Sequence, residues 1–179
     1  MSSIIALSGS NSTKSINTML LDYIVTTIHS HKASRLSLLS YDIPMYNLDL
    51  EQERGIPVDV QIIKNKIAEA DGVIIAVNEH NGMISAFFKN IFDWLSRADR
   101  NFLAGKKLLV VSTSPGARGA ASALNYIKET APRFGGEVVE SFSFPSFQDN
   151  FDVTQSSITN SDLEMGISQV VASFLQALD

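Results

Sequence analysis

"IIALSGSNSTKSIN", residues 4–17, joins a short apolar run to a loop of hydroxyl side chains with one glycine and one asparagine. The apolar residues Ile4 to Leu7 indicate a buried strand. A dinucleotide-binding turn requires G-x-G-x-x-G, and a Walker loop requires G-x-x-x-x-G-K-[ST]. Neither motif is present, because Gly9 is the only glycine between Met1 and Gly55. The stretch therefore predicts a strand that runs into a polar loop of a different kind.

The same alternation of a short apolar run and a longer helical period repeats along the chain about five times. Strands are expected over residues 3–9, 33–40, 71–78, 106–114 and 136–145. Helices are expected over residues 15–28, 58–70, 84–98, 117–134 and 163–178, with a long loop over residues 41–57. Such alternation predicts a parallel sheet with right-handed crossovers. No break in composition and no internal repeat interrupts it, so residues 1–179 are expected to form one domain.

Composition and charge exclude several classes of protein. The chain is 45% hydrophobic and 18% charged, as in an ordinary globular domain, and its net charge of −5 argues against a general binder of nucleic acid or anionic membranes. It has no cysteine, which excludes disulfides, thiolate metal sites and cysteine nucleophiles. His29, His31 and His80 form no metal-ligand pattern, so no metal site is expected. With neither a signal peptide nor a membrane span in the sequence, we expect a cytoplasmic protein.

Three polar loops follow the first, third and fourth expected strands. They comprise residues 8–17, 78–84 and 113–119, and all three are rich in small or polar residues. Open parallel sheets bind ligands outside the carboxyl ends of their strands, where the strand order reverses. The three loops therefore predict one ligand site at that edge of the sheet.

The first of these loops has the chemistry of an anion site. Ser10, Ser12, Thr13 and Ser15 offer hydroxyls, and the helix that follows presents free backbone N–H groups and a positive dipole end. Lys14 is the only cation of the loop, which contains no carboxylate. Simple capping of the helix by serine or threonine explains the loop about equally well, and the two interpretations are compatible.

Four segments together resemble a known family. They are "SGSNSTKSIN" (8–17), "DIPMYNLDLE" (42–51), "VNEHNGMISAFFKNIFDWLSR" (77–97) and "STSPGARGAASAL" (112–124). In order and spacing they resemble the NADPH-dependent FMN reductases, a family of flavin, quinone, azo-dye and chromate reductases. The resemblance extends from about Ile4 to Phe144. It implies a flavodoxin-like three-layer sandwich with a five-stranded parallel sheet.

The resemblance also implies the residues that bind FMN. The first loop would bind the phosphate, and the second and third loops would border the isoalloxazine ring, with Gly119 allowing close approach. The candidates are Ser10, Ser12, Ser15, Ile16, Asn17, Asn78, Glu79, His80, Asn81, Gly82, Ser114, Pro115, Gly116 and Gly119. Two positions depart from the family pattern: Ser12 replaces a common arginine, and His80 replaces a common tyrosine. His80 would act in packing and hydrogen bonding, or as an acid–base modulator.

The chemistry that the resemblance implies needs no catalytic side chain. FMN would take hydride from NADPH or NADH and pass electrons to a small acceptor such as a flavin, quinone or azo compound. Because donor and acceptor would share one pocket, we expect a ping-pong mechanism. Two alternatives remain: a flavodoxin-type electron carrier without nicotinamide activity, and a non-catalytic flavin-binding protein.

The helix expected at residues 84–98 carries an unusually wide apolar face. Its apolar residues span an arc of about 160°, so the side with Phe87 and Trp94 would meet either a second subunit or the protein's own core. The resemblance favours a homodimer or a dimer of dimers. In such a dimer the loop Tyr41–Pro57 would wall the neighbour's flavin pocket; otherwise it would pack on its own chain.

Overall fold

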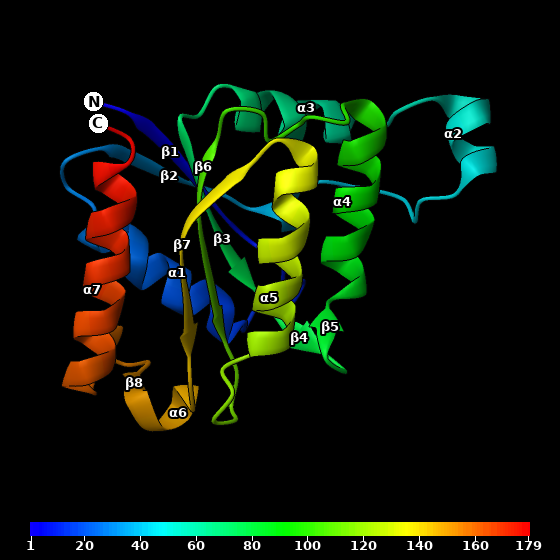
Figure 1. The fold of residues 1–179 in the computed structure, drawn as a ribbon. Coiled ribbons are helices and arrows are strands. Elements are labelled where there is room, and N and C mark those ends of the chain that lie inside the picture. Colours follow the sequence, from blue (N-terminus) through cyan, green and yellow to red (C-terminus); the bar gives the residue numbers. More distant parts are fainter.

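The computed structural model describes residues 1–179 and has one five-stranded parallel sheet in the order β2-β1-β3-β6-β7. The strands are β1 (Ser3–Ser8), β2 (Lys32–Leu36), β3 (Gly72–Val77), β6 (Lys107–Thr113) and β7 (Glu137–Phe144). Helices α1 (Ile16–Thr27) and α7 (Ser161–Gln176) cover one face. Helices α3 (Val58–Ala68), α4 (Ala86–Ala98) and α5 (Ala121–Thr130) cover the other (Figure 1). The predicted flavodoxin-like sandwich is confirmed.

Two separate apolar cores explain why the central strands read as continuous hydrophobic runs. A cluster of 25 buried residues lies between the sheet and α3, α4 and α5, and a cluster of 17 lies on the side of α1 and α7. Every residue of β3 is buried. A strand covered on both faces needs apolar side chains in both directions, so it shows no alternation of polar and apolar residues.

The end of β1 is fixed against the start of α4. Ser85 caps α4 by accepting a hydrogen bond from the backbone N–H of Phe88 at 3.1 Å, and its hydroxyl donates to the Gly9 carbonyl at 2.7 Å. A Cβ at Gly9 would lie 2.7 Å from the Phe88 ring. Glycine is therefore required at position 9 by the packing of α4 against the first loop.

Some elements differ from the sequence prediction. The second strand ends at Leu36, and a 3₁₀ turn, η1 (Leu38–Ser40), takes the place of its expected second half. The expected loop 41–57 contains α2 (Leu48–Arg54), which stands out from the body of the molecule (Figure 1). The helix expected over residues 117–134 ends earlier, as α5 at Thr130. A 3₁₀ turn, η2 (Ala131–Phe134), which contains Pro132, follows it.

The sequence pattern did not predict the short elements that follow β3 and β7. A hairpin of β4 (Glu79–His80) and β5 (Met83–Ile84) follows β3. A short helix α6 (Phe147–Asn150) and a hairpin of β8 (Phe151–Asp152) and β9 (Ser157–Ile158) follow β7. Strands of two residues are too short to show a periodicity.

The wide apolar side of α4 is covered within the chain. Trp94 is fully buried, stacks edge-on against Tyr46 with ring centroids 5.0 Å apart, and donates from Nε1 to the Pro44 carbonyl at 2.8 Å. Asn90 holds the same segment through the Tyr46 N–H at 2.7 Å and the Pro44 carbonyl at 3.0 Å. The Glu51 carboxylate accepts hydrogen bonds from Tyr46 and Arg97, and the bond from Tyr46 raises the pKa of that tyrosine. Of the two interpretations, the intramolecular contact is the one found at Trp94.

No helix of the structure combines the length and the apolar composition that crossing a bilayer needs.

Candidate functional site

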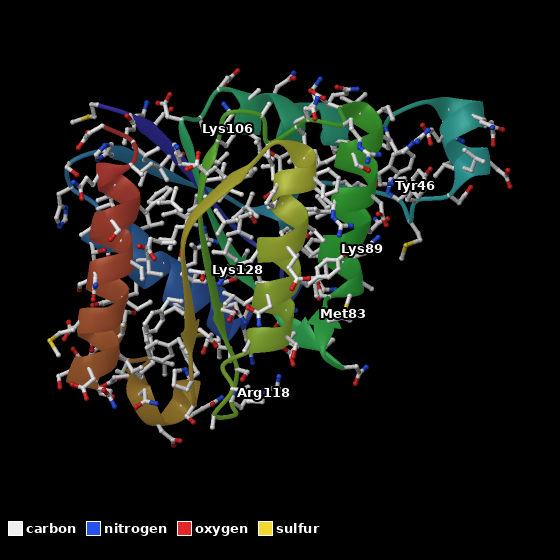
Figure 2. The ribbon with its side chains drawn as sticks, in the orientation of Figure 1. Tyr46, Met83, Lys89, Lys106, Arg118 and Lys128 are labelled. Atoms are coloured by element: carbon white, nitrogen blue, oxygen red, sulfur yellow. The ribbon has the colours of Figure 1, made fainter.

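A cavity of about 280 Å³ opens at the carboxyl ends of β1, β3 and β6. Twelve residues line it: Ser10, Lys14, Ser15, Ile16, Asn17, Asn78, Glu79, His80, Thr113, Ser114, Pro115 and Gln148. The carboxyl end of the sheet also carries Arg118, in the loop after β6, and Met83 of the β4–β5 hairpin, whereas Lys106, just before β6, lies at the opposite end (Figure 2). The three polar loops thus meet at one site.

Nine of the residues expected from the sequence line this cavity, and five do not. The five are Ser12, Asn81, Gly82, Gly116 and Gly119. Three of the lining residues were not among the candidates: Lys14, Thr113 and Gln148. In the sequence, Lys14 stands out as the only cation of its loop. Gln148 lies on α6, beyond the last strand of the parallel sheet, where no motif indicates it.

The first loop offers free backbone donors at the start of α1. The Ser15 side chain caps the helix by accepting from the Thr18 N–H at 3.2 Å, which confirms the capping interpretation for this residue. The N–H groups of Ile16 and Asn17 have no acceptor within the chain. Both residues line the cavity, so these two donors and the positive end of the helix dipole are available to an anion.

The hydroxyls of the loop mostly serve the loop itself. Ser8 Oγ accepts from the Ser10 N–H at 3.4 Å, Ser10 Oγ from the Ser12 N–H at 3.2 Å, and Ser12 Oγ from the Lys14 N–H at 3.2 Å. Each accepts from a residue two positions on, which makes the loop a series of serine turns. Ser12 lines a smaller cavity of about 80 Å³ on the far side of the loop, towards η1.

The Asn17 side chain joins the first loop to the third. Its Nδ2 donates to the Thr113 carbonyl at 3.0 Å, and its Oδ1 accepts from the Thr113 N–H at 2.9 Å. Both residues are buried. Because the amide is engaged in both bonds, Asn17 holds two walls of the cavity together and faces a ligand with its backbone N–H.

The polar side chains of the second loop, Glu79, Asn78 and His80, make different contacts. Glu79 Oε2 accepts from the Ala123 N–H at 3.1 Å and so caps α5, whose own N-cap residue, Ala120, has no side chain able to do so. Asn78 is buried, and its Nδ2 lies 3.5 Å from His80 Nε2. Asn81 and Gly82, with φ of 53° and 79°, form the turn of the β4–β5 hairpin. Their left-handed backbone makes the turn, which explains the pair N-G in the sequence.

Backbone hydrogen bonds from the segment that follows β7 hold the third loop in place. The Phe147 N–H donates to the Ser114 carbonyl and the Ser146 N–H to the Gly116 carbonyl, both at 3.0 Å. This turn carries Gln148 into the cavity. Gly119 lies against β7: a Cβ on it would stand 2.6 Å from Ser143 Oγ, and its φ is +55°. Its need for glycine comes from this strand contact.

The comparisons with known proteins agree with this architecture. A model of the family described as NADPH-dependent FMN reductase matches residues 2–149. The chain belongs to this family. In sequence it is 35% identical over 109 residues to the quinone reductase of Escherichia coli K12, a match that covers 55% of this chain and 58% of that protein. The chain therefore spans less than two thirds of that relative.

A second relative and a solved structure extend the comparison. The NAD(P)H-dependent FMN reductase PA1204 of Pseudomonas aeruginosa is 28% identical over 127 residues, which cover 71% of this chain and 68% of that protein. The flavoenzyme FerB of Paracoccus denitrificans, an NAD(P)H:(acceptor) oxidoreductase, superposes with a TM-score of 0.80 at 24% identity. That superposition covers 99% of this chain and 97% of FerB, and shows a shared fold.

The cavity fits the cofactor named by the FMN reductase family. The free N–H groups of Ile16 and Asn17, with Lys14 beside them, suit a phosphate monoester of charge about −1.5 to −2. The only lining carboxylate, Glu79, is bonded to α5. One lining residue, Asn78, has a buried acceptor, Oδ1, that has no partner in the chain. An anionic group at one end and a hydrogen-bond donor near Asn78 would satisfy these groups.

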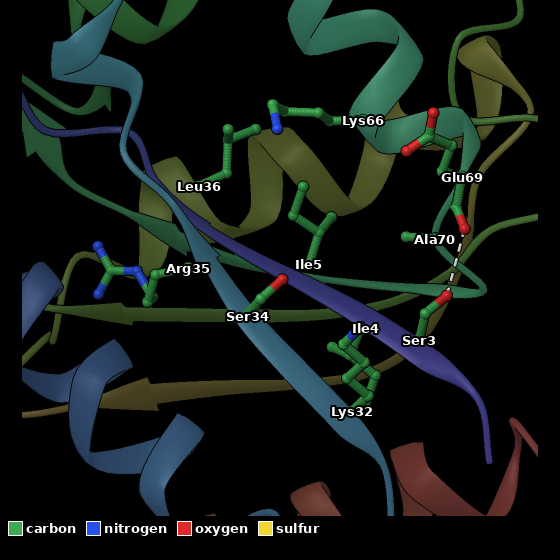
Figure 3. A pocket seen from close by; sticks show the side chains of 10 residues that line it. All are labelled: Ser3, Ile4, Ile5, Lys32, Ser34, Arg35, Leu36, Lys66, Glu69 and Ala70. Carbon is green, nitrogen blue, oxygen red and sulfur yellow. Dashed lines mark hydrogen bonds between the residues drawn. The ribbon is translucent and has the colours of Figure 1, made fainter.

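A second hollow, of about 250 Å³, lies beside β1 and β2 next to the end of α3 (Figure 3). Lys32, Arg35 and Lys66 line it together with Glu69, whose backbone carbonyl accepts a hydrogen bond from Ser3 Oγ at 3.2 Å. It shares no residue with the cavity at the carboxyl ends and contains none of the candidate residues.

Proposed function

We propose that this protein is an FMN-dependent NAD(P)H oxidoreductase that reduces a small acceptor by a ping-pong mechanism. The observation that carries the proposal is the cavity at the carboxyl edge of the sheet. It has unpartnered N–H donors of Ile16 and Asn17 at one wall and the loop of Ser114 and Pro115 at another. Membership of the FMN reductase family supports FMN as the group held there.

Residues of the chain bind and orient the cofactor. When bound, FMN supplies the redox chemistry, taking hydride from a nicotinamide and passing two electrons to an acceptor. The start of α1 would hold the phosphate through backbone donors. The N–H groups of Ser114 and Gly116, which have no acceptor in the chain, are available to stabilise negative charge on the pyrimidine edge of the ring. No side-chain base is needed in this arrangement.

Donor and acceptor would use the same opening in turn. The E. coli relative is named a quinone reductase and the P. aeruginosa relative an NAD(P)H-dependent FMN reductase, which supports NADH or NADPH as donor and a flat oxidant as acceptor. Quinones, flavins and azo compounds are the acceptor classes we propose. Steady-state plots at several acceptor concentrations test the mechanism: parallel lines support ping-pong kinetics, and lines that converge contradict it.

Spectroscopy of the purified protein tests the function itself. The account predicts a yellow protein, as isolated or after addition of FMN, whose flavin bands bleach anaerobically with NADH or NADPH. A flavin complex that is not bleached by either nucleotide would support the electron carrier or a non-catalytic flavin-binding protein. A protein that stays colourless in excess FMN would contradict the proposal.

We also propose that the protein is a homodimer, or a dimer of dimers, with the arm of residues 41–57 at the interface. Three large apolar side chains stand exposed on this arm and on the β4–β5 hairpin: Met45 at 68%, Leu48 at 53% and Met83 at 46%. Light scattering after gel filtration tests this: a mass of twice or four times the 19.5 kDa chain supports it, and a monomer at micromolar concentration opposes it.

A further inference from the structure

Asn78 carries a buried hydrogen-bond acceptor that the protein leaves unused. The residue is 6% exposed, and its Oδ1 has no donor within the chain. Buried polar groups are nearly always paired, because an unpaired one loses its hydration without gaining a partner. Its place beside the cavity means that a ligand can supply the missing donor.

The strand registers place Asn78 in the middle of the cavity. On one side Ala76 pairs with Ser8, and on the other Val77 pairs with Ser112. Extending both registers brings Asn78 between Ser10 of the first loop and the Thr113 backbone of the third. Successive side chains of a strand point to opposite faces. Ala76 packs in the core on the α1 side and Val77 in the other, so Asn78, the next residue after Val77, falls on the side where α1 begins.

The contact with His80 distinguishes the two ends of the Asn78 amide. Asn78 Nδ2 lies 3.5 Å from His80 Nε2, and an uncharged Nε2 without a proton accepts from that Nδ2. With Nδ2 directed at the imidazole, Oδ1 is the end of the amide that is left without a partner. The other charged groups that line the cavity are Lys14 and Glu79, and the Glu79 carboxylate is turned to α5.

We propose that Asn78 Oδ1 accepts a hydrogen bond from a hydroxyl of the polyol chain of FMN, which links its phosphate to its ring. This inference rests on the proposed function. The phosphate is assigned to the start of α1 and the ring to the loops beyond Asn78, so the part of the ligand that passes Asn78 is the chain between them. That chain carries hydroxyl donors. His80 is a positioning residue that orients the Asn78 amide.

The test measures FMN binding by the flavin-free protein, followed by flavin fluorescence. The ligands are FMN and its three monodeoxy analogues, each lacking one chain hydroxyl. With the unaltered protein, one analogue binds about tenfold more weakly than FMN. Asn78→Leu, which keeps the size of the side chain, binds FMN about tenfold more weakly and no longer distinguishes FMN from that analogue. Because Leu removes an unpaired buried polar atom, the flavin-free variant unfolds at a temperature equal to or above that of the parent.

Two outcomes overturn the proposal without casting doubt on the FMN site. One is equal binding of FMN and all three analogues by the unaltered protein, which needs no variant to be folded. The other is an Asn78→Leu variant that keeps the full discrimination against the weak analogue. If the unaltered protein does not bind FMN at all, the proposed function fails instead.

A pair of His80 variants tests the positioning role. His80→Gln keeps an acceptor at a similar reach and retains discrimination against the weak analogue. His80→Phe keeps a planar ring without an acceptor and loses it. Equal discrimination in both variants contradicts the role assigned to His80.

Discussion

Replacement of Asn17 by Ala separates two ways in which this residue can serve the site. The Asn17 amide forms two buried hydrogen bonds with the Thr113 backbone, at 2.9 and 3.0 Å. Its loss leaves the N–H and C=O of Thr113 without partners, and each such group costs about 1–3 kcal/mol when buried. Water entering from the adjacent cavity would lower this cost, so we expect about 2–4 kcal/mol of the free energy of unfolding to be lost. For a chain of this length that corresponds to a fall in Tm of roughly 4–16 °C.

The assay is urea unfolding of the flavin-free protein, followed by the fluorescence of Trp94. This residue is the only tryptophan and is fully buried, so its emission reports unfolding of the α4 core. FMN affinity is measured in parallel. The account predicts that Asn17→Ala loses both stability and affinity. A variant that loses affinity while its flavin-free form is as stable as the parent would refute the reasoning, because Asn17 would then act on the ligand directly.

Three further predictions test other parts of the structure. Gly119→Ala should cost at least about 2 kcal/mol, because of its left-handed backbone and a clash with β7, whereas Gly116→Ala, with 3.9 Å to its nearest atom, should stay within about 0.5 kcal/mol; equal losses in chemical denaturation would contradict this. The Asp71 carboxylate accepts hydrogen bonds from the backbone and hydroxyl of Ser3, which hold the pKa of Asp71 below its ordinary value of 3.8. Its stabilisation is therefore present in full above pH 3.8 and is lost as the pH falls through the lower pKa of the folded state, so Asp71→Asn should lower Tm at pH 7 and the gap should close in strong acid; a gap independent of pH would oppose this. Asn90→Ala should free the arm of residues 41–57 and speed its cleavage by a protease in limited proteolysis, while Asp49→Ala on the arm's exposed helix serves as control; equal cleavage rates would contradict the anchoring role.

Long periodic segments made the fold predictable. The covering helices bury apolar side chains at a helical spacing and the central strands are short apolar runs, so the alternation of strands and helices followed from the sequence pattern. The three-layer sandwich was implied by the resemblance to the FMN reductases. The α2 helix escaped because its seven residues bury no side chain and therefore show no apolar stripe. Its signal was local: the Asn47 side chain accepts from the Leu50 N–H at 2.8 Å and starts the helix.

The candidate site was predictable to the level of loops and less so for single contacts. Eleven of the twelve lining residues lie in the three polar loops, where strand ends meet, and nine of these were among the candidates. Asn17 bonds a residue 96 positions away, and such a non-local contact leaves no pattern in the sequence. Gly119 illustrates the converse. The resemblance implied that its lack of a side chain makes room for the flavin ring, whereas in the structure β7 packs against it. A residue type indicates a constraint without indicating which neighbour imposes it.

The central claim is that backbone donors at the start of α1 bind the phosphate of FMN. Titration of the flavin-free protein with FMN and with riboflavin, which lacks only the phosphate, tests it most directly. Two charge-assisted hydrogen bonds predict that FMN binds at least about 100-fold more tightly than riboflavin, with a preference that shrinks as inorganic phosphate is added. Equal affinity for the two flavins would contradict the account.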